Sequence, residues 1–115
     1  MFFTYRQNNS GGSFEEDEKS GIGVTVIVEA DNADEANARA KDIGLYFDGA
    51  GDCECCGYRW SEAYPEEVGD EVPSIYGEPI DFDSAEGSNI SVMGYNYKVM
   101  GFVHYKDGQI KTFWF

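Results

Sequence analysis

The sequence predicts an α+β fold in which one short helix packs on a mostly antiparallel sheet. Three observations carry this prediction: a run of β-branched residues at 23–30 (GVTVIVEA), a capped, alanine-rich helix over 32–44, and two aromatic-rich segments that flank Asp107-Gly108. In chain order we expect strand, strand, helix, strand, a loop-rich stretch, and two strands that form a C-terminal β-hairpin. A chain of 115 residues is expected to form one domain, residues 1–115.

The first two strands are predicted from β-forming residues and from alternation. Residues 2–7 (FFTYRQ) are rich in β-formers and precede a polar run of Asn, Ser and Gly. In the segment 23–30 the valines at positions 24, 26 and 28 point to one face of the sheet, and the residues between them point to the other. Further short strands are expected at Tyr58–Trp60, after the helix, and at 74–76, where pairing with the sheet is an option.

The helix is predicted by its caps and by its apolar stripe. Asn32 is a good N-cap, and Glu35 three residues later completes a pair that resembles a capping box. Gly44 is expected to end the helix. The stripe consists of small apolar residues at spacings of three and four, namely Ala33, Ala36, Ala40 and Ile43. Because alanine has little bulk, this face can lie close to a sheet.

Asp107-Gly108 predicts a two-residue turn between strands at 95–105 and 109–115. This turn would pair Val103 with Thr112 on one face and Phe102 with Phe113 on the other. Both faces are apolar towards the open end of the hairpin. One face can pack on the helix, so the other needs a cover from the acidic segment 61–90 or from another molecule.

Negative charge is the strongest bulk property of the chain. The sequence has 22 acidic and 8 basic residues, a net charge of −14, and residues 61–90 contain no Lys or Arg. Such a surface repels a nucleic-acid backbone, so direct nucleic-acid binding is not expected. It attracts a basic protein partner. The alternative interpretation is that the acids only maintain solubility.

Neither a membrane span nor a secretion signal is predicted. No apolar stretch approaches the roughly 20 residues that a transmembrane helix needs. The N-terminus (MFFTYRQNN) has no basic region followed by a long apolar one. We therefore expect a cytoplasmic protein with reduced thiols.

All three cysteines lie in the segment 51–60 (GDCECCGYRW). Cys53 and Cys56 form a C-x-x-C pair followed by Gly57, as in half of a zinc knuckle, and Cys55 and His104 would bring the ligand number to the four that structural zinc needs. The second C-x-x-C is missing, and adjacent cysteines rarely bind one ion. We therefore favour a structural loop without metal or other cofactor, and keep a small zinc-binding domain as an alternative.

Two groups of polar residues are candidate binding sites. The loop after the first strand offers amide and hydroxyl groups that suit a small polar ligand or a peptide edge, from Gln7, Asn8, Asn9 and Ser10. The acidic segment offers carboxylates to a basic partner, from Glu66, Glu67, Asp70, Glu71, Asp81 and Asp83. A plain turn and a solvated acidic face are the alternatives. No catalytic constellation is visible, so an enzyme is not expected, and His104 is expected to be a packed or half-exposed sheet histidine.

Three segments, FFTYRQNNSGGSF, VIVEADNADEANARAKDIGLYFDG and DCECCGYRW, resemble an uncharacterised family of small tailed-phage and prophage proteins. Their order and a late tyrosine-rich strand with a Lys-Asp-Gly turn resemble that family as well. The resemblance covers residues 1–60 and the final hairpin, whereas residues 61–90 have no counterpart. It implies no activity, but it implies a setting, because small phage proteins often act by binding a host component, including defence systems.

The function we expect is therefore that of a small acidic phage-encoded binding protein. It would inhibit a host factor, for example a defence effector, by protein–protein contact in the cytoplasm of the infected bacterium. The host protein would present a basic surface. One alternative is a sponge that sequesters a nucleotide signal in a pocket built from residues 7–13 and the sheet aromatics. A homodimer is a further option.

Overall fold

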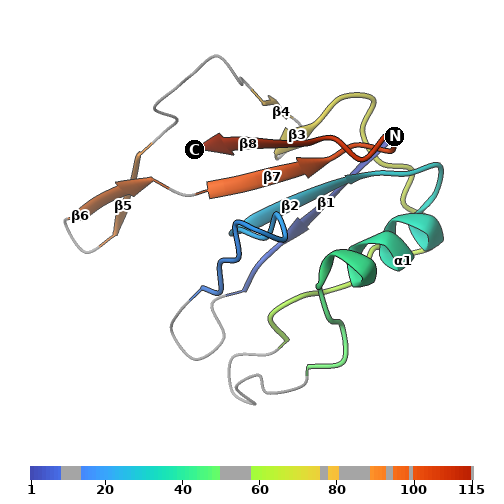
Figure 1. Cartoon of the computed structure of the whole chain (residues 1–115), viewed down its shortest axis with the longest axis horizontal. Helices are drawn as coiled ribbons and strands as arrows, with labels where there is room; N and C mark the ends of the chain where they lie inside the picture. Colours follow the sequence, from blue (N-terminus) through green and yellow to red (C-terminus); the bar gives the residue numbers. More distant parts are fainter. Residues whose placement is uncertain are drawn as a thin grey trace.

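A four-stranded sheet in the order β1-β2-β7-β8 lies at the centre of the fold, with one helix on one of its faces (Figure 1). Its strands are β1 (Phe2–Arg6), β2 (Thr25–Glu29), β7 (Met100–His104) and β8 (Ile110–Trp114), and the helix is α1 (Ala33–Ile43). The computed structural model describes residues 1–8, 14–49, 58–75, 78–80, 89–92, 95–98 and 100–114.

The predicted fold class is confirmed. β1 pairs with β2 and β7 pairs with β8 in antiparallel fashion. β2 and β7 are parallel, with Ile27 opposite Val103. Parallel neighbours need a long connection, and α1 together with the segment that follows it supplies this connection. The sheet is therefore mostly antiparallel, with one parallel pair at its centre.

The helix has the predicted ends and the predicted buried face. The Asn32 Oδ1 accepts a hydrogen bond of 2.8 Å from the backbone N–H of Glu35. At the other end Gly44 has a φ of 130°, and the N–H groups of Gly44 and Leu45 donate to carbonyls of the last helical turn. Glycine tolerates this positive φ without steric cost, so it ends the helix. The buried helical residues are the three alanines Ala33, Ala36 and Ala40.

The C-terminal hairpin is present, but its predicted register is wrong by one residue. The structure pairs Val103 with Lys111 and Gly101 with Phe113. The Tyr105 N–H donates to the carbonyl of Gln109, so the loop has three residues, and the last of them, Gly108, has a φ of 92°. A three-residue loop with a left-handed glycine is the next most common hairpin after the two-residue turn. Because strand side chains alternate, the shift places Phe113 on the face of Val103 and not on that of Phe102.

Other predicted strands differ from the observed ones. Residues 58–60 form no regular strand, although the Arg59 carbonyl accepts a hydrogen bond from the Asn8 N–H. The predicted strand over 95–105 is divided between β7 and β6 (Tyr95–Lys98), and β6 pairs with β5 (Asn89–Val92) in a separate ladder. β3 (Ser74–Ile75) pairs with β4 (Glu78–Pro79) and not with the sheet. The short ladder still contacts β1, because the Thr4 hydroxyl donates to the Ser74 carbonyl.

Both faces of the main sheet are covered. The larger core cluster lies between the sheet and α1 and includes Phe3, Tyr5, Val26, Val28, Leu45 and Trp60. The cluster on the opposite face contains Phe2, Ile27, Val103 and Phe113, and Ile75 and Ile80 pack against it. Ile75 and Ile80 belong to the acidic segment 61–90. Of the two covers that the sequence left open, the acidic segment or another molecule, the acidic segment supplies these two contacts.

Candidate protein-binding surface

Gln7 follows the last residue of β1 and is buried at the base of the loop that was predicted to bind a ligand. Its Nε2 donates to the carbonyls of Glu15 and Gly23 at 2.8 and 3.1 Å. Its Oε1 accepts from the Glu15 N–H at 2.6 Å and from the Arg59 guanidinium at 2.8 Å. The side-chain amide of Gln7 is therefore committed to holding the two ends of the loop together, and a ligand would have to displace these bonds.

The rest of that loop is described only at its edges. The Asn8 N–H donates to the Arg59 carbonyl at 2.8 Å, and its side-chain amide lies 3.4 Å from the Tyr58 carbonyl. Asn9 and Ser10 lie outside the described residues. The structure thus brings residues 7–8 together with 58–60, which are about fifty positions away in the chain. Arg59 is itself buried, and its Nε lies 3.8 Å from the Glu15 carboxylate.

Residues 61–72, which we call the acidic strip, follow directly after this cluster. The strip carries five acids, Glu62, Glu66, Glu67, Asp70 and Glu71, and no Lys or Arg. It leaves the Arg59 cluster, passes α1 and reaches the start of β1 (Figure 1). Its course is therefore set by contacts with elements that are distant in the sequence.

The start of the acidic strip is fixed by Asn37 of α1. The Asn37 Oδ1 accepts from the Ala63 N–H at 2.8 Å, and its Nδ2 donates to the Ala63 carbonyl at 2.9 Å. The same Oδ1 accepts a 2.8 Å bond from the Tyr5 hydroxyl. Burial raises the pKa of Tyr5, and the negative charges of Glu67 and Glu62 raise it further, so the hydroxyl keeps its proton and remains a donor.

The far end of the acidic strip is fixed to the start of β1. Phe2 and Asp70 exchange two backbone hydrogen bonds of 2.7 and 2.8 Å. Gly69 has a φ of 74°, and a Cβ at this position would lie only 2.9 Å from the Phe2 carbonyl oxygen. The close approach of the strip to β1 therefore requires a glycine at position 69.

Acidic and apolar side chains of the acidic strip are exposed side by side. Glu66, Glu67, Asp70 and Glu71 are all exposed, as predicted for a binding face or a solvated one. Tyr64, Val68 and Val72 of the same strip are 64, 74 and 48 % exposed. A hollow of about 270 Å³ lies between Val68 and the start of β1. Asp81 and Asp83, the other two acids of the predicted site, lie outside the described residues.

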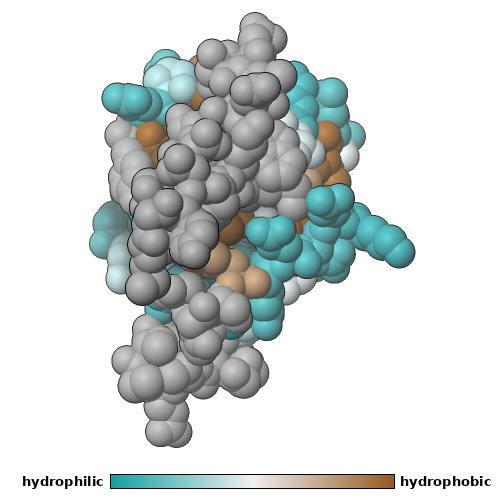
Figure 2. Space-filling model, turned by 90° about the vertical axis from the view of Figure 1, so that its left-hand side faces the viewer, coloured by the Kyte–Doolittle hydropathy of each residue, from teal (hydrophilic) through white to brown (hydrophobic). Residues whose placement is uncertain are grey.

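The molecular surface mixes the two kinds of residue elsewhere as well. Among the residues that Figure 2 colours, small hydrophobic areas lie next to hydrophilic ones. A binding surface of a non-obligate complex has this mixed composition, because only its centre is strongly apolar.

His104 is a buried histidine of the sheet, as predicted. Its Nε2 lies 2.7 Å from the Gly21 carbonyl oxygen, which can only accept, so Nε2 carries the proton. Burial lowers the pKa of His104, and the Arg39 guanidinium lowers it further. The three predicted cysteine ligands, Cys53, Cys55 and Cys56, lie outside the described residues. Within the described part of the chain, no three metal-binding side chains come together.

Comparison with known proteins gives a family and no activity. A family model described as "Domain of unknown function (DUF7296)" matches residues 1–115. This chain belongs to the DUF7296 family. No curated protein and no solved structure matches it. For this DUF7296 protein the function must therefore be argued from the geometry. No helix among the described residues is long and apolar enough to cross a membrane.

Sequence reasoning on this DUF7296 chain missed the residues that position the acidic strip. Asn37 was one of them, although a signal existed, because it lies four positions after Ala33 and next to the alanine stripe that faces the sheet. A polar residue there must find a partner when the helix packs. Arg59 offered no comparable signal, since its contact with Gln7 joins two irregular segments.

Proposed function

We propose that this protein is a non-enzymatic binding protein whose acidic strip contacts a basic surface of a partner protein. The observation that carries the proposal is the exposure of Tyr64, Val68 and Val72 on an acidic segment that is held in place. These three side chains offer apolar area that a partner could bury, beside carboxylates that could pair with its basic groups.

The two kinds of side chain would contribute differently to binding. Carboxylates at the edge of an interface steer a basic partner and speed its association. Apolar side chains at the centre supply the burial that slows dissociation. The hydrogen bonds to Asn37 and Phe2 hold the strip in one conformation before binding, so less conformational entropy is lost on association.

The biological setting of the proposal comes from the sequence resemblance to small phage proteins. In that setting the partner is a bacterial host protein, and binding would inhibit it, as for a component of a defence system. The resemblance in residues 1–60 and in the final hairpin supports this setting, whereas the acidic strip supports only the contact itself.

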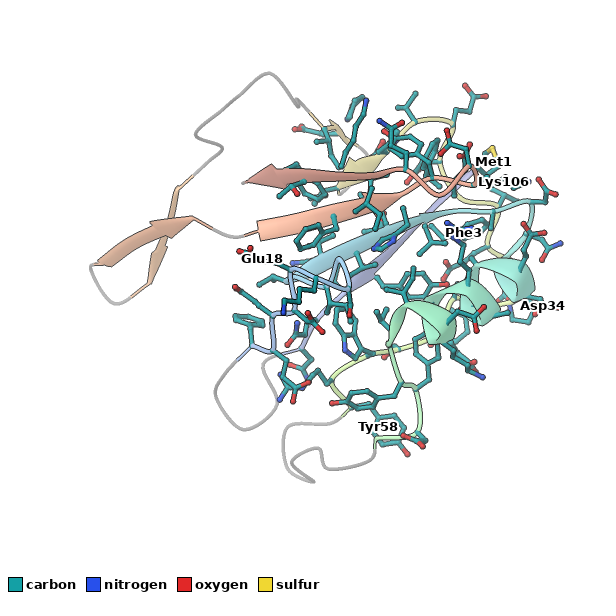
Figure 3. The ribbon with its side chains drawn as sticks, viewed as in Figure 1. Met1, Phe3, Glu18, Asp34, Tyr58 and Lys106 are labelled. Carbon is teal, nitrogen blue, oxygen red and sulfur yellow. The ribbon has the colours of Figure 1, made fainter. Side chains whose placement is uncertain are left out.

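The test compares two variants of equal net charge as baits in a bacterial lysate. In the first, Glu66, Glu67 and Glu71 of the strip are changed to Gln. In the control, three exposed acids elsewhere, Glu18, Asp34 and Asp42, are changed to Gln or Asn. Figure 3 labels the first two of them. Proteins captured by the wild type are identified by mass spectrometry, and their affinity is then measured with purified material.

We expect the strip variant to lose a basic protein that the wild type and the control variant both retain. Raising the salt from 0.05 to 0.5 M should weaken this complex by about tenfold or more, because exposed charges are screened within a few ångströms at high salt. A Val68→Ser change should weaken it as well, with little dependence on salt. Equal capture by both triple variants, or a complex insensitive to salt, would contradict the proposal.

A further inference from the structure

A second groove, of about 330 Å³, lies between the loop that precedes β2 and the C-terminal end of α1. Its floor is apolar and aromatic and consists of Ile22, Ile43, Tyr46 and Trp60. The two walls are close together, since a Cβ on Gly44 would lie 3.1 Å from the Ile22 side chain. The volume is at the lower end of the range for ligand pockets, so the groove suits one side chain or a small molecule.

The edge of this groove is negatively charged. Glu15, Glu16 and Asp17 line it, and no Lys or Arg is among its described lining residues. Glu15 is partly compensated by Arg59, whose Nε lies 3.8 Å away. Asp17 accepts a 2.9 Å hydrogen bond from the Ser20 hydroxyl, which helps to hold the pKa of this carboxyl below its usual value. The charge of Lys19 also acts on Asp17, so Glu16 supplies most of the uncompensated charge.

The end of α1 adds to the negative potential of the groove. Gly44 is both the residue that ends the helix and a residue of the groove wall. The C-terminal end of a helix carries the equivalent of about half a negative charge and favours cations nearby. The negative potential therefore disfavours binding of an anion in the groove. An apolar ligand would not interact with the carboxylates at its edge.

We propose that this groove holds the side chain of an arginine from a partner protein. Its methylene stem would lie on the isoleucines, and its planar guanidinium would stack on the Tyr46 ring with its N–H groups directed to Glu16 and Asp17. Guanidinium fits better than ammonium because it stacks on aromatic rings and pairs with carboxylates at the same time. The inference rests on the proposed function only for the source of the arginine.

The test uses a small probe and does not require the partner. The protein labelled with ¹⁵N is titrated with N-acetyl-arginine amide, and the amide signals of Ser20 and Gly44 and the indole signal of Trp60 are followed. We expect saturable shifts at these three positions. N-acetyl-citrulline amide has nearly the same shape without the charge, and it should bind about tenfold more weakly.

Two single variants localise the charge that matters. Glu16→Gln should weaken the binding of N-acetyl-arginine amide by about threefold, as expected for one exposed ion pair. Glu18→Gln removes the same charge from the same loop, but Glu18 does not line the groove, so it should leave the affinity unchanged. Both side chains are exposed, and neither change should affect folding.

Several outcomes would overturn the inference. These are equal binding of the citrulline probe, equal effects of the two variants, shifts spread over the whole acidic surface, or tighter binding of spermidine, which would indicate a free polyamine. The outcome is separable from that of the lysate experiment. Saturable binding of N-acetyl-arginine amide without capture of a basic partner would support the groove inference and contradict the proposed function. Capture of a basic partner without binding of the probe would support the proposed function and contradict the groove inference.

Discussion

The two faces of the main sheet are buried by different means. On the face that α1 covers, the buried polar side chains Gln7 and His104 have hydrogen-bond partners in distant loops, and the Tyr5 hydroxyl is bonded to Asn37. On the opposite face the buried core side chains Phe2, Ile27, Val103 and Phe113 are apolar, and the rings of Phe2 and Tyr105 meet edge to face at 5.8 Å. The partly buried Thr4 adds a side-chain hydrogen bond on that face, from its hydroxyl to the Ser74 carbonyl.

Thr25 differs from the buried polar side chains of the helix face, because it has no hydrogen-bond partner among the described residues. It lies in β2 and is fully buried, with its side chain directed away from the helix, on the side of Ile27. Its Oγ1 has no hydrogen-bond partner among the described residues. The hydrogen bonds of polar side chains on the helix face fix the positions of the loops that they contact. The buried Thr25 hydroxyl on the other face lowers stability, because no hydrogen bond among the described residues offsets the free-energy cost of its burial. Replacing the bonded Gln7 and replacing the unbonded Thr25 by an apolar residue should therefore change the free energy of unfolding in opposite directions.

The largest effect is expected for Gln7→Leu on the helix face. The change leaves the Glu15 N–H, the Gly23 carbonyl and a bond of the buried Arg59 without their partner. We expect the free energy of unfolding to fall by about 3 kcal/mol, measured by urea denaturation. Gln109→Leu is the matched control, since Gln109 is exposed, and should change stability by less than about 0.5 kcal/mol. A loss below 1 kcal/mol for Gln7→Leu would show that the network is dispensable.

Asn37→Ala should have the next largest effect. It removes the partner of both backbone groups of Ala63 and of the Tyr5 hydroxyl. We expect a loss of about 2 kcal/mol in the free energy of unfolding, with the acidic strip more accessible to proteolysis.

Tyr5→Phe separates the contribution of the Tyr5 hydrogen bond from that of the Ala63 bond to the same Asn37 oxygen. Both the Tyr5 hydroxyl and the Ala63 N–H donate to the Asn37 Oδ1, so the losses from Tyr5→Phe and Asn37→Ala should add to more than that of the double variant. Strict additivity would mean that the Tyr5 bond contributes nothing.

A pH effect is expected from His104, a buried histidine on the helix face. Burial lowers the pKa of His104 in the folded protein, so on acidification the unfolded chain takes up this proton first. The free energy of unfolding should therefore fall as the pH drops from about 6.5, the unfolded value, towards the lower folded value. Urea denaturation at intervals between pH 5.5 and 7.5 measures this slope.

His104→Gln tests the assignment of the slope. The Gln amide can still donate to the Gly21 carbonyl but does not titrate, so the variant should show a flatter profile between pH 5.5 and 7.5. Hydrogen bonds from Ser20 and Lys106 hold the pKa values of Asp17 and Asp31 below the usual value of an aspartate, so their stabilising contributions are lost only at more acidic pH. An unchanged slope in His104→Gln would assign the effect to another group.

Features with local causes could be predicted from the sequence. The helix ends follow from Asn32 and Gly44, whose roles depend on neighbouring residues alone, and both are observed. The hairpin turn differs because Asp107-Gly108 is compatible with loops of two and of three residues. Contacts from outside the hairpin accompany the longer loop, since the Lys106 N–H donates to Glu29 and the Tyr105 ring meets Phe2. No local pattern contains this information.

The candidate binding surface was predictable in its charge and not in its shape. The acids of the strip could be counted in the sequence, and their exposure follows from the cost of burying carboxylates. The exposure of Val68 and Val72 could not, because it depends on where Asn37 and Phe2 hold the strip. Gln7 is the opposite case of a polar residue that is buried, although it was expected to be available to a ligand in a loop.

The smallest effect, and the one of opposite sign, is expected for Thr25→Val. The two side chains have nearly the same shape, and the change removes a buried hydroxyl that has no partner among the described residues. We expect the protein to gain about 1 kcal/mol in the free energy of unfolding. Thr112→Val, on the exposed edge of the same sheet, serves as control and should stay within about 0.5 kcal/mol of the wild type. A loss of stability in Thr25→Val would show that this hydroxyl is bonded, and the contrast between the two faces would then disappear.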